Sequence, residues 1–319
     1  MITLNGERGF EKVETWEEIT EIPGFEDNLD PKEHQLKEII GRYIFKDFMP
    51  CGLSTCRQPH GKGYIVTTKT GQVTNIGNGC GKTHFGVDFQ EQSKIFNRAL
   101  TEHNNREALA TFLFGLESNL EELEMLKAGE AGANSIYMKS KSLIQVGKGV
   151  PASVTKQINE LVRRRSGDIT IPRQASEEEI NDLETIQNRK LERPYYIDES
   201  VGNLRGLETL YTENDIRKIL IKDLQENLKV LSDLDISTAT FSELQFWVKW
   251  CSQYEQKIES VKKSMKNGIL LLNKDNLFQL LATIENTDDV KEFKKWVNQN
   301  TLKTHNQTLK HDAQNARAS

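Results

Sequence analysis

The residues best suited to chemistry in this chain are cysteines and histidines that gather between residues 51 and 89. Three of the four cysteines and two of the six histidines lie there. In chain order they are Cys51, Cys56, His60, Cys80 and His84. Thiolate and imidazole are the ligands that Zn²⁺ prefers in closed tetrahedral sites. The spacing therefore predicts a zinc site formed by the three cysteines, with either His84 or His60 as the fourth ligand.

The sequence between the two groups of ligands has the pattern of a β-hairpin. One strand begins at Tyr64, residues 69–72 supply turn chemistry, and the return strand reaches Ile76. Cys80 then opens a helical run, in which it shares one face with His84 at i, i+4. A cysteine knuckle, a hairpin and a ligand-bearing helix start together resemble a treble-clef zinc finger. The resemblance implies a structural zinc site and a role in nucleic-acid machinery.

The glycines of the same stretch also resemble a Walker A phosphate loop. Residues 76–83 read Ile-Gly-Asn-Gly-Cys-Gly-Lys-Thr, against the pattern G-x4-G-K-[ST]. Lys82 would reach the outer phosphates and Thr83 would hold magnesium. However, Ile76 stands where the first glycine belongs, and the preceding strand alternates polar and apolar residues, unlike a buried parallel strand. A P-loop-like nucleotide-binding protein that uses Gly77–Thr83 is therefore an alternative to a zinc-binding head.

The hairpin is also similar to that of GIY-YIG nucleases. Gly63-Tyr64-Ile65 is followed by Asn75-Ile76-Gly77. That family uses tyrosines of the hairpin together with an arginine and a glutamate beyond it. Here the second tyrosine is replaced by asparagine, the first is displaced by one position, and no arginine lies between Gly77 and Arg98. The resemblance implies a nuclease of this type or its inactive relative.

The composition narrows the class of protein. The 319 residues are 36% hydrophobic and 28% charged, with a mean hydropathy of −0.60, which is typical of elongated helical proteins with narrow buried stripes. A net charge of −5 excludes a uniformly basic nucleic-acid surface, although local basic patches remain allowed. The first twenty residues are acidic, and no apolar run is long enough to span a membrane. With clustered cysteines, we expect a cytoplasmic protein without a membrane segment.

The rest of the chain is dominated by helical periodicity. We expect a mainly α fold with a small β-hairpin zinc module, an elongated helical or coiled-coil body and a C-terminal helical bundle. The predicted domains are a zinc-binding α+β module (1–90), a long helical segment (91–148), a hinge with short helices (149–210), a helical bundle (211–300) and a disordered tail (301–319), which includes His305 and His311.

Three further expectations concern the local structure of single segments. Residues 1–12 look irregular, and Asp30 with Pro31 predicts the start of a helix whose apolar face includes Leu36 and Ile39. A long helix is predicted over 88–127. Its heptad-like spacing over residues 95–123 makes pairing into a homo-oligomer an alternative expectation.

Positive charge is expected at two places. Around the zinc module, phosphate contacts would come from Arg57, Lys62, Lys69, Lys82 and Lys94. The run Arg163-Arg164-Arg165 ends a predicted helix, where it either complements the helix dipole or binds an anion or nucleic acid. No catalytic triad stands out, so we expect a non-catalytic zinc-stapled adaptor that binds nucleic acid or a protein partner through its head and helical body. A structural coiled-coil oligomer is a further alternative.

Overall fold

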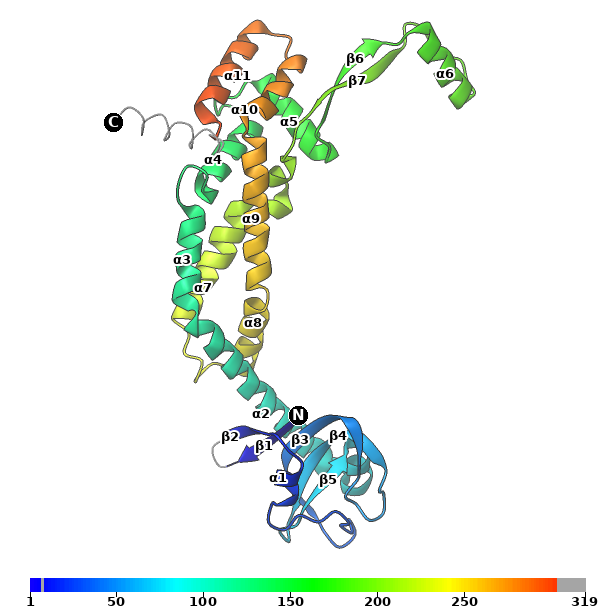
Figure 1. Cartoon of the computed structure of the whole chain (residues 1–319), viewed down its shortest axis with the longest axis vertical. Helices are drawn as coiled ribbons and strands as arrows, with labels where there is room; N and C mark the ends of the chain where they lie inside the picture. The colour runs from blue at the N-terminus through cyan, green and yellow to red at the C-terminus, as the bar shows by residue number, and fades with distance from the viewer. Residues whose placement is uncertain (7–8, 303–319) are drawn as a thin grey trace, which may run out of the picture. The chain divides into compact units, whose positions relative to one another are not determined.

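The computed structural model describes residues 1–6 and 9–302 of the chain (Figure 1). The predicted disordered tail, with His305 and His311, lies outside the described residues from Lys303 onward. The chain divides into two compact units. The first comprises residues 1–111 and 235–248, and the second holds the remainder.

The first unit is organised by a five-stranded antiparallel sheet of order β2-β1-β3-β4-β5. Its strands are β1 (Ile2–Gly6), β2 (Gly9–Val13), β3 (Leu36–Pro50), β4 (Pro59–Thr68) and β5 (Val73–Gly77). The predicted hairpin is confirmed as β4 and β5, which pair from Gly63–Gly77 to Thr67–Val73. It is one part of a larger sheet.

Apolar side chains cover both faces of this sheet. On one face, Phe89 and Phe96 of helix α2 (Asn78–Phe114) pack with Tyr64 of β4. On the other, Ile19 of helix α1 (Glu17–Thr20) joins Tyr43 in a second buried cluster. The core of the unit is therefore two thin layers, one on each side of the sheet.

The expected fold class, mainly α with only a small hairpin, is wrong, because the chain forms this five-stranded sheet and a second, two-stranded one. Residues 1–12 were expected to be irregular, but residues 2–6 and 9–13 form the antiparallel pair β1 and β2. The helix expected after Pro31 is strand β3. The pairing of β3 with β4 shifts register between Leu36 and Glu38 and again before Gly41. A bulge inserts an extra residue, so buried positions in a strand acquire a helix-like spacing of three.

The described part of the second unit consists of helices and one two-stranded antiparallel sheet. Its helices are α3 (Leu116–Lys127), α4 (Ala133–Ile144), α5 (Ala152–Arg164), α6 (Glu177–Gln187), α7 (Glu226–Ser232), α9 (Tyr254–Leu271), α10 (Lys274–Phe278) and α11 (Thr287–Asn300). Shorter 3₁₀ and π segments are η1 (Leu207–Leu210), η2 (Thr212–Asn214), η3 (Lys218–Gln225) and η4 (Gln279–Thr283). Helix α8 (Phe241–Cys251) spans the boundary between the units. The long helix predicted over 88–127 is instead α2 and α3, separated at Gly115.

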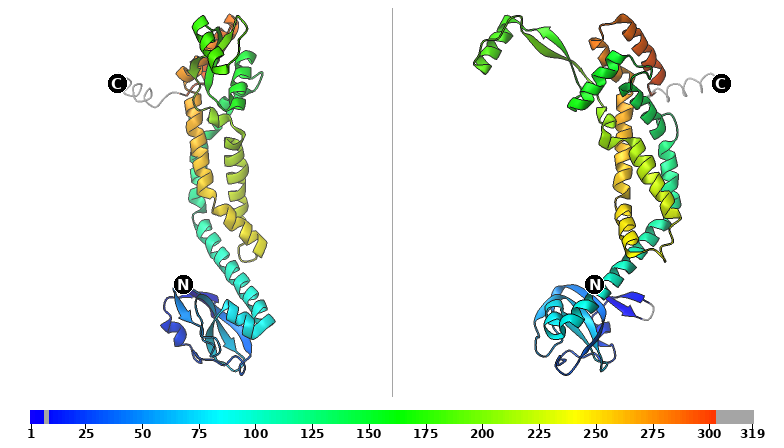
Figure 2. Two further views of the ribbon diagram at one scale, coloured as in Figure 1. Left: turned by 90° about the vertical axis from the view of Figure 1, so that its right-hand side faces the viewer. Right: turned by 180° about the vertical axis from the view of Figure 1, so that it is seen from behind.

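Within the second unit, α9 runs alongside α7 and α3 in both views (Figures 1 and 2). Strands β6 (Asp168–Gln174) and β7 (Tyr196–Asn203) form an antiparallel ribbon, which carries α6 at its far end. Helix α6 begins with a capping box, in which the side chains of Ser176 and Glu179 each accept from the other's backbone N–H. Among the described residues, the helices lack the combined length and apolar character that a membrane crossing requires.

Candidate metal centre

Two separate segments bring the three cysteines of the first unit together. Cys51 and Cys56 lie in the connection between β3 and β4, and Cys80 lies in the first turn of α2, directly after β5. The backbone N–H of Cys56 donates to the carbonyl of Leu53 at 3.1 Å, which makes the connection a tight turn. The N–H of Gly52 donates to the carbonyl of Asn75 at 2.8 Å and ties that turn to β5. The β-hairpin therefore places the turn beside the start of the helix.

The three sulfur atoms have the spacing of a metal site. All of them lie within 4.8 Å of one another. Cys56 Sγ and Cys80 Sγ are 2.9 Å apart, longer than a disulfide bond, and all three cysteines are free thiols. A tetrahedral site with Zn–S bonds of about 2.3 Å would separate its sulfurs by roughly 3.8 Å. Small movements of the side chains would accommodate one zinc ion.

The pKa values of the three thiols show that deprotonating all of them without a cation is unfavourable. Burial raises the pKa of Cys51, while burial together with hydrogen bonding to Cys56 raises the pKa of Cys80 to about 12. Burial alone would raise the pKa of Cys56, but hydrogen bonds from Cys80, the backbone of Gln58 and Cys51 together outweigh it and lower the pKa. The thiolate of Cys56 is thus stabilised by its neighbours. Deprotonation of Cys51 and Cys80 is disfavoured by burial and by the nearby thiols. A divalent cation would reverse this preference, because a metal deprotonates the thiols that bind it.

The two candidate histidines differ in how their ring nitrogens are used. His60 Nδ1 lies 3.1 Å from the carbonyl oxygen of Gln58, which can only accept, so Nδ1 carries the proton. Its Nε2 then accepts from the hydroxyl of Tyr43, which in turn accepts from Nδ2 of the buried Asn75 at 3.2 Å. Both nitrogens of His60 are therefore occupied within the fold.

His84 is the better placed of the two. It lies one helical turn after Cys80, and its Nε2 has a hydroxyl of Thr55 as a neighbour at 3.5 Å. An open cleft of about 620 Å³ borders the cysteines, and both histidines contribute to its lining. Cys56, Cys80 and His84 line this cleft, whereas Cys51 is buried. Among the described residues, the group of ligand atoms within 4.8 Å of one another comprises the three sulfurs and does not include a nitrogen of either histidine.

The glycine stretch that resembles a phosphate loop lies mainly within helix α2. Residues 78–83 are already helical, and the hydroxyl of Thr83 donates to the carbonyl of Gly79 at 3.0 Å. The ring of Phe89 occupies the space that a side chain at Gly81 would need. Lys82 is exposed. Packing against Phe89 therefore explains Gly81, whereas a side chain at Gly79 would meet no neighbour within 4 Å.

The hairpin that resembles a GIY-YIG nuclease pairs in register, with Gly63 opposite Gly77 and Tyr64 opposite Ile76. However, Tyr64 is buried under Phe89, and its hydroxyl accepts from Asn97 at 2.7 Å. Its side chain therefore serves the core of the first unit and does not open onto the cleft beside the cysteines.

The basic residues proposed for nucleic acid fall into two groups. In the first unit, Lys62 lines the cleft beside the cysteines, while Arg57 donates to the carbonyl of Asp27 and Lys69 to the side chain of Gln35. The arginine run belongs to the second unit, so the structure does not join it to this surface.

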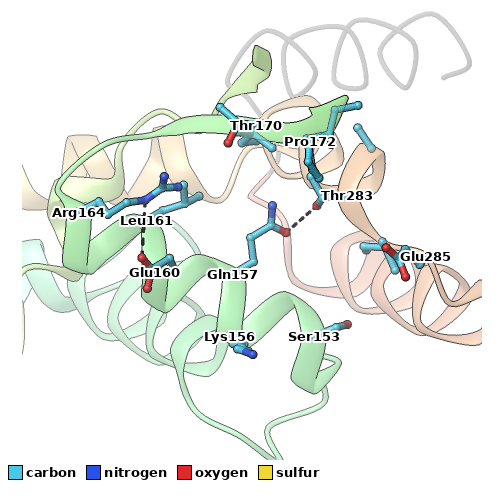
Figure 3. Close-up of a pocket in the computed structure, with 14 residues that line it drawn as sticks. Ser153, Lys156, Gln157, Glu160, Leu161, Arg164, Thr170, Pro172, Thr283 and Glu285 are labelled. Atoms are coloured by element: carbon cyan, nitrogen blue, oxygen red, sulfur yellow. Dashed lines mark hydrogen bonds and ion pairs between the residues drawn. The ribbon is translucent and has the colours of Figure 1, made fainter. Parts of the chain in front are cut away.

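Each arginine of that run faces a carboxylate. Arg163 lies 2.6 Å and Arg164 3.9 Å from Glu160, and Arg165 lies 2.6 Å from Glu213. Figure 3 shows Arg164 opposite Glu160 at the edge of a cleft of about 630 Å³. Two carboxylates thus offset part of the positive charge of the three arginines, which accounts for the run through ion pairs of the second unit.

Sequence reasoning missed Tyr43 and Thr55, the partners that distinguish the two histidines. Both contacts join residues far apart in the chain, and only the sheet brings them together. Comparison of the chain with protein-family models, with curated proteins and with solved structures found no match. The assignment of a function therefore rests on the geometry of the site.

Proposed function

We propose that the first unit binds one structural zinc ion through Cys51, Cys56 and Cys80, with His84 as the fourth ligand, and acts as the head of a non-catalytic adaptor. The observation that carries this proposal is the convergence of three thiols from two segments, with no disulfide formed among them. Four strong N/S ligands leave no position for substrate, which is typical of a site that stabilises a fold.

The zinc ion would stabilise a segment that lacks regular secondary structure. The turn that holds Cys51 and Cys56 lies between two strands and has no regular secondary structure. Zinc would tie this turn to the first turn of α2. Reduced thiols are required for this, so we place the protein in a reducing compartment such as the cytoplasm.

The binding partner we propose is nucleic acid, with a protein as the other outcome. Lys62, Lys82 and Lys94 have no carboxylate within 4.0 Å among the residues that the structure describes. Lysines without ion pairs are available to phosphate oxygens and release counterions when they bind them. The cleft beside the cysteines lies in the same unit as these lysines.

The test is a matched pair of variants. Cys80→Ser removes one ligand, whereas Cys251→Ser makes the same chemical change at a half-buried thiol outside the cluster. We expect one zinc per chain in the unaltered protein and in Cys251→Ser, and loss of zinc in Cys80→Ser. Elemental analysis measures this.

The same proteins would then be titrated with a fluorescent single-stranded oligonucleotide at two salt concentrations. Binding that weakens with salt and that falls in a Lys62→Gln, Lys82→Gln variant supports nucleic acid as the partner. Zinc binding without any oligonucleotide binding would retain the structural site and assign the partner to protein.

A further inference from the structure

A second cleft in the first unit has the features of an anion-binding site. It encloses about 560 Å³ between the β2-β1-β3 edge of the sheet and helix α2. Its lining shares no residue with the cleft beside the cysteines. It is therefore separate from the proposed zinc site, and nothing in that proposal uses its residues.

The strand register places two cations in this cleft, one on each side of Thr3. Thr3 of β1 pairs with Lys12 of β2 on one side and with Arg42 of β3 on the other. Residues directly opposite in an antiparallel sheet point to the same face, with Cβ atoms about 5 Å apart. Lys12, Thr3 and Arg42 thus form a continuous row of two cationic groups around one hydroxyl.

Arg42 is held ready for a ligand. Its Nη1 donates to Oδ1 of Asn97 at 3.2 Å, and Nδ2 of Asn97 donates to the hydroxyl of Tyr64 and to the carbonyl of Ser93, both at 2.7 Å. These bonds fix the amide, and the amide in turn orients the half-buried guanidinium. Preorganisation of this kind lowers the entropic cost of binding.

Neither cation forms an ion pair with a described carboxylate. Across the described part of the chain, no carboxylate lies within 4.0 Å of Arg42 or Lys12. The acidic residue of the cleft is Glu107, which lies 3.4 Å from His103 Nε2. A partly buried guanidinium without a carboxylate is costly, and an oxyanion with two oxygen atoms matches its fork.

The lining of the cleft is mixed, with an apolar part beside the polar side chains of His103, Asn104 and Glu107. Phe10, Ile44 and Leu100 contribute to the apolar part, and the Phe10 ring lies 5.4 Å from both Phe96 and His103. We propose that this cleft binds a small molecule that carries a phosphate or carboxylate group on a flat apolar body, with Arg42 and Lys12 on the oxyanion and Phe10 against the body.

The experiment is a ligand-observed NMR titration of the full chain with phenyl phosphate, benzoate and inorganic phosphate. We expect saturable binding in which the aromatic probes bind more tightly than inorganic phosphate. The order of phenyl phosphate and benzoate identifies the oxyanion. Arg42→Gln should weaken binding at least tenfold, whereas Lys37→Gln, which removes an equal charge from an exposed site on the same strand, should leave it unchanged.

Absence of saturable binding for all three probes would overturn the proposal, as would equal affinities in Arg42→Gln and Lys37→Gln. If Arg42→Gln does not fold, as judged by circular dichroism, Lys12→Gln replaces it. That residue is exposed on β2, and its variant should weaken binding at least threefold. An unchanged affinity there would also reject the site.

Discussion

The cysteine cluster of the first unit and the arginine run of the second are both short gatherings of one chemical group, yet the structure treats them differently. The three thiols converge on one another without a counter-charge. Of the three arginines, Arg163 and Arg164 share Glu160, and Arg165 pairs with Glu213 of the same unit. The difference teaches that a gathering of like groups indicates a ligand only where the fold leaves the groups uncompensated.

The largest effect is expected from removing the proposed zinc ion with a chelator. Zinc binding contributes directly to folding where the site does not form without it. Dialysis against a chelator should therefore lower the unfolding free energy of the first unit by at least about 4 kcal/mol. Hydrogen exchange would show faster exchange in residues 51–58 and in the first turns of α2, while α9 should exchange at its original rate.

Equal protection of residues 51–58 with and without chelator would contradict a structural role for the metal. Cys251→Ser is the control for nonspecific thiol effects in this experiment, because its sulfur lies in α8 and outside the cluster.

Loss of the hydrogen bonds that Tyr43 makes with His60 and Asn75 should lower the unfolding free energy by less than loss of zinc. Tyr43→Phe removes the hydroxyl that accepts from buried Asn75 and donates to His60. Loss of partners by buried polar groups costs about 1–3 kcal/mol, which denaturant unfolding would measure. The zinc content should stay at one per chain. If zinc were lost in this variant, His60 and not His84 would be the histidine coupled to the metal.

Much of the site was predictable and much of the fold was not. The hairpin and the helix beginning near Cys80 follow from local turn and helix signals, so the sequence could place the cysteines together. Strand β3 could not be recognised, because its register shifts give Leu36 and Ile39 the spacing of a helix. The choice between the two histidines depends on Tyr43 and Thr55, and those contacts exist only after the sheet has formed.

A smaller effect is expected at the ion pair between Arg173 and Glu179 in the second unit. Glu179 accepts from Arg173 and from the backbone of Ser176, and these bonds lower its pKa to about 2, from 4.5 in the unfolded chain. A depressed carboxylate pKa stabilises the folded state above the unfolded pKa and ceases to do so as pH falls toward the folded one. Protection of α6 should therefore decline between pH 4.5 and 2. An NMR titration of Glu179 with a midpoint above 4 would contradict this.

The smallest effect is expected at the arginine run. Arg163 and Arg165 are exposed and paired with exposed carboxylates, and such pairs contribute little to stability. Replacing both with glutamine should leave the melting temperature and oligonucleotide affinity unchanged within error. A marked loss of affinity would show that these arginines leave their ion pairs to bind phosphate. The contrast between the arginine run and the cysteine cluster would then be wrong.

The central claim, that three thiolates and His84 hold zinc, is tested most directly by X-ray absorption at the zinc edge of the purified full chain. We predict one zinc per chain with three sulfur neighbours at about 2.3 Å and one nitrogen neighbour at about 2.0–2.1 Å. In His84→Ala the three sulfurs should remain while the nitrogen is lost. A chain without zinc, or zinc surrounded only by nitrogen and oxygen, would contradict the assignment.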